Sequence, residues 1–161
     1  MEEILTERLL INVLTEADAS FIIELVNTPE WLLFIGERNV KTNDDALKYI
    51  DKILGSPALQ YWMVRLCEST TAIGIITLIQ RDYLADKDIG FAFLPQYTKK
   101  GFAIEATKAL LKKVQCELPV IKAVTISHNI NSISLLEKLG FVFEKILEID
   151  SEKLELYSIS T

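Results

Sequence analysis

Residues 88–106, which read DIGFAFLPQYTKKGFAIEA, decide the fold of this chain. Asp88 to Leu94 is a β-like run closed by Pro95, and a helical pattern of apolar residues begins at Phe102. The first N–H groups of a helix lack backbone partners and lie at the positive end of its dipole, so they attract anions. The stretch therefore predicts a strand, a turn suited to a phosphate, and a helix.

Two lysines and one glycine give this turn its chemistry. Lys99 and Lys100 bring positive charge to a chain whose formal net charge is −6, and Thr98 adds a hydroxyl. Gly101 would let the backbone approach a phosphate closely. Loop lysines are commonly solvated and one glycine is weak evidence, so a solvated turn stays open beside a phosphate site.

The segments on both sides predict an α/β fold with a mixed sheet. The β-like runs are residues 8–14, 60–67, 72–79, 88–94, 120–126, 141–149 and 154–159. Helices are expected after Thr15 and Thr42, over 102–116 and over 130–139, with a short irregular or helical piece at 29–36. The strand–helix–strand order around 102–116 implies one parallel pair in an otherwise antiparallel sheet.

A second polar stretch follows the strand at 120–126. Residues 127–143 read SHNINSISLLEKLGFVF, and Gly140 is expected to end the helix. Asn129 and Ser132 could cap this helix or turn polar atoms toward a ligand. The pattern alone leaves both interpretations open.

Length and composition limit the function classes. A chain of 161 residues fits a single domain, residues 1–161. The negative net charge argues against nucleic acid as a partner. Cys67 and Cys116 share no metal-ligand spacing, no apolar stretch has transmembrane length, and the N-terminus is acidic. We therefore expect a cytoplasmic protein without a metal or a membrane partner.

The ordered set of stretches resembles the GNAT superfamily of N-acetyltransferases, and within it the RimJ/RimL-type branch. Residues 6–30 resemble that branch's opening strand and first helix, 88–106 its acetyl-CoA motif, and 129–141 its second cofactor motif. The resemblance implies a mostly antiparallel sheet with a splayed central parallel pair and helices on both faces. It also implies transfer of an acetyl group from acetyl-CoA to a primary amine.

The same resemblance implies a cofactor site. The family's pyrophosphate loop reads Arg or Gln, two variable residues, Gly, one variable residue, then Gly or Ala. Gly101 and Ala103 match this pattern, whereas Thr98 departs from it. The implied cofactor-binding residues are Phe93, Leu94, Thr98, Lys99, Lys100, Gly101, Phe102, Ala103, Asn129 and Ser132.

Acetyl transfer needs a neutral amine and benefits from a proton for the leaving thiolate. Asp88 stands where many relatives carry an acid, which implies a base, although a solvent-facing strand-end aspartate is equally open. Glu148 and Asp150 are lesser alternatives. Leu136 replaces the tyrosine that many members use as the acid, and the RimL-like branch implies Ser132 in that role.

The N-terminal helices and their loop are expected to form the pocket for the amine. Candidate wall residues are Trp31, Phe34, Arg38 and Asn39, although Trp31 and Phe34 also suit a core. The acceptor could be a small molecule or a protein N-terminus, and the protein a monomer or a homodimer. The departures at Thr98 and Leu136 keep open a non-catalytic acyl-CoA-binding or regulatory module. An unrelated nucleotide-binding domain is disfavoured, because the chain lacks a Rossmann fingerprint and a Walker loop.

Overall fold

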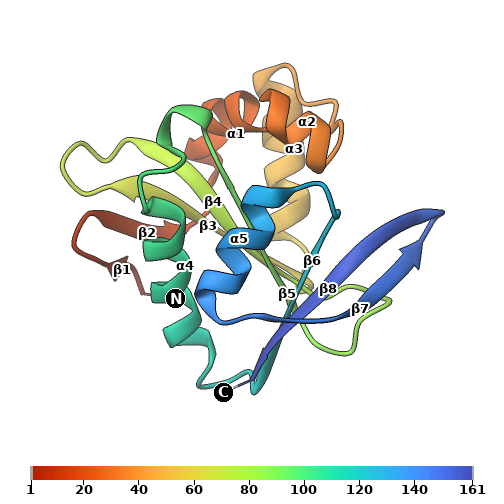
Figure 1. The fold of residues 1–161 in the computed structure, drawn as a ribbon. Helices are drawn as coiled ribbons and strands as arrows, with labels where there is room; N and C mark the ends of the chain where they lie inside the picture. Colours follow the sequence, from red (N-terminus) through yellow and green to blue (C-terminus); the bar gives the residue numbers. More distant parts are fainter. Residues whose placement is uncertain (1, 161) are drawn as a thin grey trace.

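The computed structural model describes residues 2–160, which fold around one eight-stranded sheet (Figure 1). The sheet order is β1-β2-β3-β4-β5-β6-β8-β7. The strands are β1 (Ile4–Leu5), β2 (Leu9–Val13), β3 (Leu59–Leu66), β4 (Ala72–Ile79), β5 (Asp88–Phe93), β6 (Val120–Thr125), β7 (Val142–Ile149) and β8 (Glu152–Ser160). The helices are α1 (Ala19–Val26), α2 (Pro29–Phe34), α3 (Asn43–Leu54), α4 (Phe102–Val114) and α5 (Ile130–Leu139).

Local sequence signals explain where the helices begin. The hydroxyl of Thr42 accepts a hydrogen bond from the N–H of Asp45 at 3.1 Å, and the Asp45 carboxylate accepts one from the N–H of Thr42 at 3.0 Å. This reciprocal cap starts α3 at the predicted place. Thr15 is followed first by a short 3₁₀ turn (Glu16–Asp18), so α1 begins only at Ala19.

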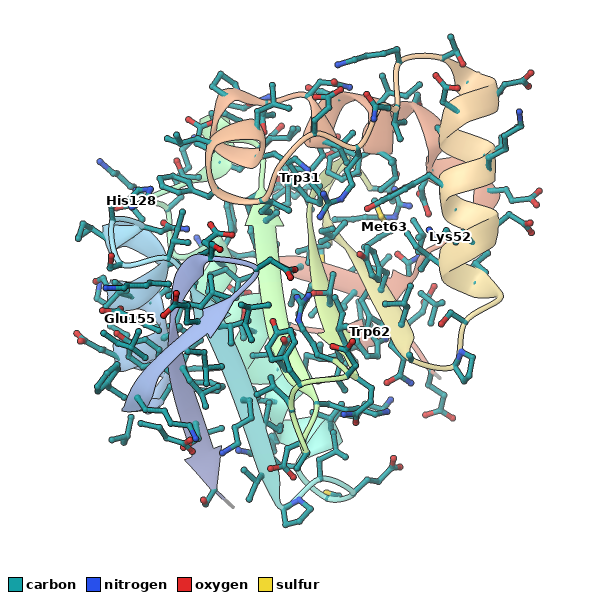
Figure 2. All side chains as sticks on the ribbon, turned by 90° about the vertical axis from the view of Figure 1, so that its right-hand side faces the viewer. Trp31, Lys52, Trp62, Met63, His128 and Glu155 are labelled. Carbon is teal, nitrogen blue, oxygen red and sulfur yellow. The ribbon has the colours of Figure 1, made fainter. Side chains whose placement is uncertain are left out.

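Two hydrophobic cores lie on opposite faces of the sheet. Successive strand residues alternate between them: Trp62 belongs to the core under α4 and α5, and Met63 to the core under α1, α2 and α3 (Figure 2). On β4, Ile76 and Ile75 divide in the same way. The prediction of a mixed sheet with helices on both faces is confirmed.

The parallel pair β5–β6 separates almost as soon as it forms. Across residues 2–160 the ladder between these strands has one Cα pair, Asp88 opposite Lys122, and the Lys122 N–H donates to the Lys87 carbonyl at 2.9 Å. On its other side, β5 pairs with β4 along its whole length, from Asp88 to Phe93. The edge of β5 that faces β6 is therefore left without backbone partners beyond its first residue.

The two ends of the sheet show features that the sequence pattern missed or misplaced. The two-residue strand β1 and a 3₁₀ turn at Pro95–Tyr97 were not expected. The predicted closing hairpin is present, but its second strand, β8, lies against β6, and β7 forms the outer edge. Its tip projects from the body of the sheet (Figure 1). No helix within the described residues is both long enough and apolar enough to cross a membrane.

Candidate active site

A cleft of about 780 Å³ opens where β5 and β6 separate. Residues of β5, β6, α4 and α5 line it, together with α2 and the loop that follows α2. Most of the predicted site residues line this cleft: Trp31, Phe34, Arg38, Phe93, Thr98, Lys99, Gly101, Ala103, Asn129 and Ser132. The others do not: Asn39, Asp88, Leu94, Lys100 and Phe102. The structure thus brings distant parts of the chain to one cavity.

One end of the cleft is the turn of residues 98–103, called here the glycine corner. Gly101 precedes α4 with φ +82°, a left-handed conformation that favours glycine. A Cβ there would lie 3.2 Å from Arg8 Nη2. The N–H of Glu105 donates to the Gly101 carbonyl at 3.1 Å. The N–H groups that precede this first bond of the helix remain free for an anion.

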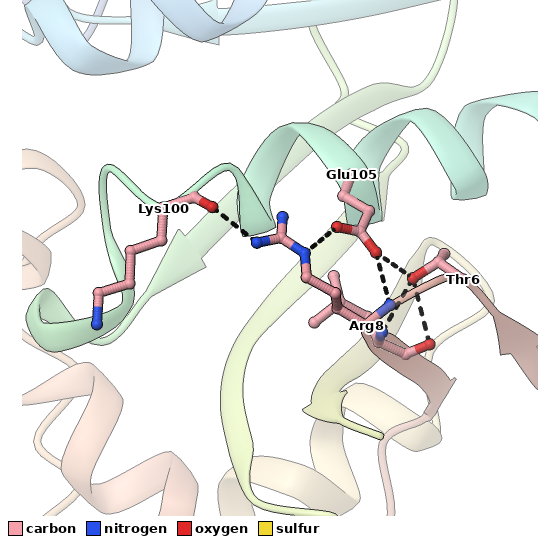
Figure 3. A network of polar contacts seen from close by, with 5 residues as sticks. Thr6, Arg8, Lys100 and Glu105 are labelled. Carbon is pink, nitrogen blue, oxygen red and sulfur yellow. Dashed lines mark hydrogen bonds and ion pairs between the residues drawn. The ribbon is translucent and has the colours of Figure 1, made fainter. Parts of the chain in front are cut away.

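Arg8 ties the glycine corner to the start of β2 (Figure 3). Its Nη1 donates to the Lys100 carbonyl at 3.0 Å, and its Nε donates to Glu105 Oε2 at 2.7 Å. The Glu105 carboxylate also accepts from the Arg8 N–H at 3.0 Å and from the Thr6 hydroxyl at 2.6 Å. Residues 6–8 were predicted only as part of the opening strand, and this network was not expected.

The charge of Glu105 is stabilised by these partners. Burial raises the pKa of Glu105, but the hydrogen bonds from Thr6 and Arg8 outweigh it and hold the pKa below its usual value. The guanidinium of Arg8 also lies 4.4 Å above the centre of the Phe102 ring. Residues on both sides of Gly101 are therefore held by one arginine.

Three predicted cofactor residues, Leu94, Lys100 and Phe102, do not line the cleft. Lys100 supplies the carbonyl that Arg8 binds, and its Nζ lies 5.9 Å from the centre of the Tyr97 ring. Phe102 packs under the Arg8 guanidinium. Leu94 is 3 % exposed and belongs to the core under α1–α3. Of the two lysines in the corner, Lys99, with φ 59°, is the one that lines the cleft.

Asn129 and Ser132 lie at the start of α5. Asn129 Oδ1 accepts a hydrogen bond from the Ser132 N–H at 3.3 Å, so Asn129 caps the helix. Ser132 lines the cleft, and its hydroxyl has no hydrogen-bond partner among the described residues. Leu136, one helical turn further on, is 1 % exposed. Ser132 is thus an uncommitted proton donor beside an apolar wall.

Asp88 is buried behind an arginine. Its side chain is 2 % exposed, so the solvent-facing interpretation of this aspartate is wrong. Arg81 Nε donates to Asp88 Oδ2 at 2.5 Å, and Arg81 lines the cleft whereas Asp88 does not. Burial raises the pKa of Asp88, and the adjacent Arg81 charge only partly offsets it. Glu148 and Asp150, on the β7–β8 hairpin, do not line the cleft.

Another part of the cleft, called here the arginine end, combines the predicted wall residues with Tyr61, Arg81 and Tyr83, which the sequence did not indicate. It is lined by Trp31, Phe34, Arg38, Tyr61, Arg81 and Tyr83. Burial raises the pKa of Tyr61, and so does neighbouring Tyr49, while the charges of Arg38 and Arg81 act in the opposite direction. Every second side chain of a strand lies on the same face. This alternation, followed from Ile75 through Thr77 and Ile79, could have placed Arg81 on the cleft face.

The helix α2 closes the arginine end. Trp31 is 5 % exposed, and the Arg38 guanidinium carbon lies 5.8 Å from the centre of its ring. Phe34 reaches the ring of His128, with 5.9 Å between centroids, so α2 meets the loop before α5 there. Figure 2 shows Trp31 and His128 on the two elements that meet. Asn39 lies outside the cleft with φ 55°, its N–H bonded to Glu37 Oε1 at 3.3 Å.

Comparisons with known proteins identify the family. The model of the acetyltransferase (GNAT) domain matches residues 8–142. The chain is 30 % identical over 139 residues to the "Uncharacterized N-acetyltransferase YnaD" of Bacillus subtilis (strain 168), covering 85 % of this chain and 81 % of that protein. The chain therefore belongs to the GNAT acetyltransferase family and is an acyltransferase.

Solved structures show the same fold. A GNAT-family acetyltransferase from Bacillus anthracis superposes with a TM-score of 0.82 at 25 % identity, covering 99 % of this chain and 98 % of that one. A spermidine N-acetyltransferase from Vibrio cholerae, solved with CoA and spermine, gives a TM-score of 0.82 at 21 % identity and covers 96 % of each chain. The narrower placement in the RimJ/RimL branch stays a prediction.

Proposed function

We propose that residues 1–161 form one cytoplasmic N-acetyltransferase domain that moves an acetyl group from acetyl-CoA to a primary amine. The observation that carries the proposal is the separation of β5 from β6 directly beside the glycine corner. A free strand edge and a free helix N-terminus then lie in one cleft. They offer amide groups and an anion site, the two features that an acyl-CoA needs.

The glycine corner and the β5 edge fit the two parts of coenzyme A. The free N–H groups at the start of α4 suit a diphosphate, and Lys99 adds a positive charge. The backbone of β5 at Phe93 can satisfy the amides of a pantetheine arm, because within residues 2–160 the ladder between β6 and that edge has its one Cα pair at Asp88. Thr98, Gly101 and Ala103, which line the cleft, then contact the coenzyme directly.

Bound acetyl-CoA supplies an acetyl group activated as a thioester, and the chain's own residues then manage protons. Asp88 takes the proton of the amine, through a water, at Oδ1, since its Oδ2 accepts from Arg81. The raised pKa of Asp88 makes it a better proton acceptor than an ordinary carboxylate. Ser132 donates a proton to the leaving thiolate, because it lines the cleft and its hydroxyl has no other partner among the described residues.

The amine binds at the arginine end of the cleft. Trp31 and Phe34 supply apolar walls there, and the cleft connects this end with the glycine corner. Holding both reactants in one cavity lowers the entropic part of the barrier, an effect worth about 7 kcal/mol or more in favourable cases. The acceptor approaches from the α2 side, opposite the corner.

The direct test combines binding with turnover. A thermal shift with acetyl-CoA should raise the melting temperature, and free thiol should appear when a panel of primary amines is added. Gly101→Glu places a carboxylate in the corner and should abolish both signals. Binding of acetyl-CoA without release of thiol for any amine would favour a non-catalytic module and contradict the proposal.

A further inference from the structure

The arginine end presents hydrogen-bond donors that have no acceptors. Arg38 forms no hydrogen bond or ion pair with any residue in the part of the chain that the structure describes, and its guanidinium carbon lies 5.8 Å from the centre of the Trp31 ring. The indole Nε1 of Trp31 is a buried donor, and it also lacks a hydrogen-bond partner within residues 2–160. A buried donor is normally satisfied, so the Trp31 Nε1 indicates a ligand that brings an acceptor atom, and the exposed guanidinium of Arg38 is available to the same ligand.

A second guanidinium faces the same space. Arg81 uses Nε for Asp88, and no described residue accepts from its two terminal nitrogens. Arg81 lines the cleft and Asp88 does not, so the cation of this pair is the member that a ligand meets. Arg38, Arg81 and Tyr61 all line this cleft, and the charges of both arginines lower the pKa of Tyr61 against the larger effect of burial.

The charge of the cleft is opposite to that of the whole chain. The chain has a formal net charge of −6. The charged residues that line the cleft are Arg38, Arg81, Lys99, Lys138, Glu30 and Glu152. Lys99 belongs to the glycine corner and serves the diphosphate, which leaves Arg38, Arg81 and Lys138 as cations without an assigned ligand, and of these only Arg38 and Arg81 belong to the arginine end. Glu30 and Glu152 are exposed, so neither neutralises these guanidinium groups by a buried contact.

We infer that the amine accepted by this enzyme also carries a carboxylate, which binds to the guanidinium groups of Arg38 and Arg81. A guanidinium presents a planar fork of donors that matches the two oxygens of a carboxylate. The Trp31 Nε1–H offers one more donor beside Arg38. With its carboxylate held at the arginine end, the amine of such a molecule extends toward the glycine corner and the acetyl group.

This inference rests on the proposed acetyl transfer and excludes one acceptor class. A polyamine such as the spermine in the Vibrio cholerae structure carries several positive charges. Two guanidinium groups would repel such a molecule. Asp88 is paired with Arg81, and the exposed carboxylates of Glu30 and Glu152 would attract a polyamine only weakly through solvent. The same fold therefore serves a different acceptor in this chain.

The test compares each amino acid with its own amide. A series of ω-amino acids of two to six carbons, the matching carboxamides and spermidine are assayed for thiol release at saturating acetyl-CoA. Rates are expressed as kcat/KM for the neutral amine. A hydrogen bond to a charged group at this partly exposed site predicts a preference of about tenfold or more for the best acid over its amide, mainly through KM.

Two variants test whether Arg38 causes the preference for the acid over its amide. Arg38→Gln keeps a polar side chain without the charge and should bring the acid-to-amide ratio close to one. Lys52→Gln also removes one positive charge, but from the exposed outer face of α3, and should keep the wild-type ratio (Figure 2). Because Arg38 is exposed and makes no polar bond to the described residues, its replacement should leave the melting temperature unchanged.

Each outcome has a distinct meaning. Equal use of acids and amides, or a preference for spermidine, overturns the carboxylate inference and leaves acetyl transfer to an amine intact. An acid preference that survives Arg38→Gln overturns the assignment to Arg38. Failure of every amine in the panel, by a protein that binds acetyl-CoA, overturns the inference together with the proposed function.

Discussion

Replacing Glu105 by glutamine should loosen the glycine corner without removing any group that contacts the cofactor. The carboxylate of Glu105 accepts the Arg8 Nε–H at 2.7 Å, and the same arginine holds the Lys100 carbonyl at 3.0 Å. Glutamine can still accept from Thr6 at one oxygen. Its amide nitrogen, however, would face the Arg8 guanidinium. Because both groups only donate hydrogen bonds, none could form between them.

The expected loss in the free energy of unfolding depends on how exposed the Arg8–Glu105 ion pair is. A hydrogen bond to a charged group contributes about 1.5–3 kcal/mol when protected, and an exposed ion pair about 0–1 kcal/mol. The side chains of Arg8 and Glu105 are 42 % and 19 % exposed. We therefore expect a loss of about 1–2 kcal/mol in the free energy of unfolding, with about 2–4 °C in Tm for each kcal/mol.

The assay is the affinity for acetyl-CoA, measured by calorimetry. If the whole loss of about 1–2 kcal/mol must be overcome when acetyl-CoA binds the glycine corner, the Kd of acetyl-CoA rises by at most about 5–30-fold. Glu144→Gln is the matched control, because Glu144 pairs with Lys122 between β7 and β6, away from the corner. The control should lower Tm without changing the Kd. Equal Kd values for both variants and the wild type would refute the claim that this network holds the corner.

The same substitution has a pH signature. The pKa of Glu105 in the folded protein lies below its usual value of 4.5, so its ionised form stabilises the fold fully above that pH. This stabilisation is lost as the pH falls through the folded-state pKa. The difference in Tm between the wild type and Glu105→Gln should therefore be constant above pH 4.5 and shrink below it. A constant difference at all pH values would mean that the charge is not involved.

Three further predictions concern the chemistry of the cleft. Ser132→Ala should lower kcat by about tenfold or more with little change in acetyl-CoA affinity, whereas Ser134→Ala, on the same cleft wall, should not. Asp88→Asn should lower kcat more than cofactor affinity and remove the acidic limb of the pH–rate profile. That limb should lie above the usual carboxyl range, because burial raises the pKa of Asp88; an unchanged profile would remove Asp88 from the mechanism. Gly101→Ala should weaken acetyl-CoA binding, because alanine is strained at φ +82° by about 1 kcal/mol or more, and an unchanged Kd would contradict this.

The order of elements could be predicted from the sequence because each has a local signal. The Thr42 cap, the turn at Gly101 and the stop at Gly140 all mark boundaries that the structure keeps. The parallel pair followed from the strand–helix–strand order. The pairing of β8 with β6 did not, because which strand of a hairpin adds to a sheet is decided by packing across the whole domain.

The site was predictable where its residues are close in the sequence. Gly101 and Ser132 lie in short motifs, and both line the cleft. The ties from Arg8 to Glu105, and from Arg81 to Asp88, depend on the fold and on side-chain direction. The first spans 97 residues and joins the start of β2 to α4, so no local pattern could reveal it.

A crystal structure of the protein with coenzyme A would test the central claim most directly. The account predicts the diphosphate on the N–H groups of residues 99–103 and the pantetheine arm along the free edge of β5. Coenzyme A bound elsewhere, or a corner that stays closed to it at saturating concentration, would contradict the account.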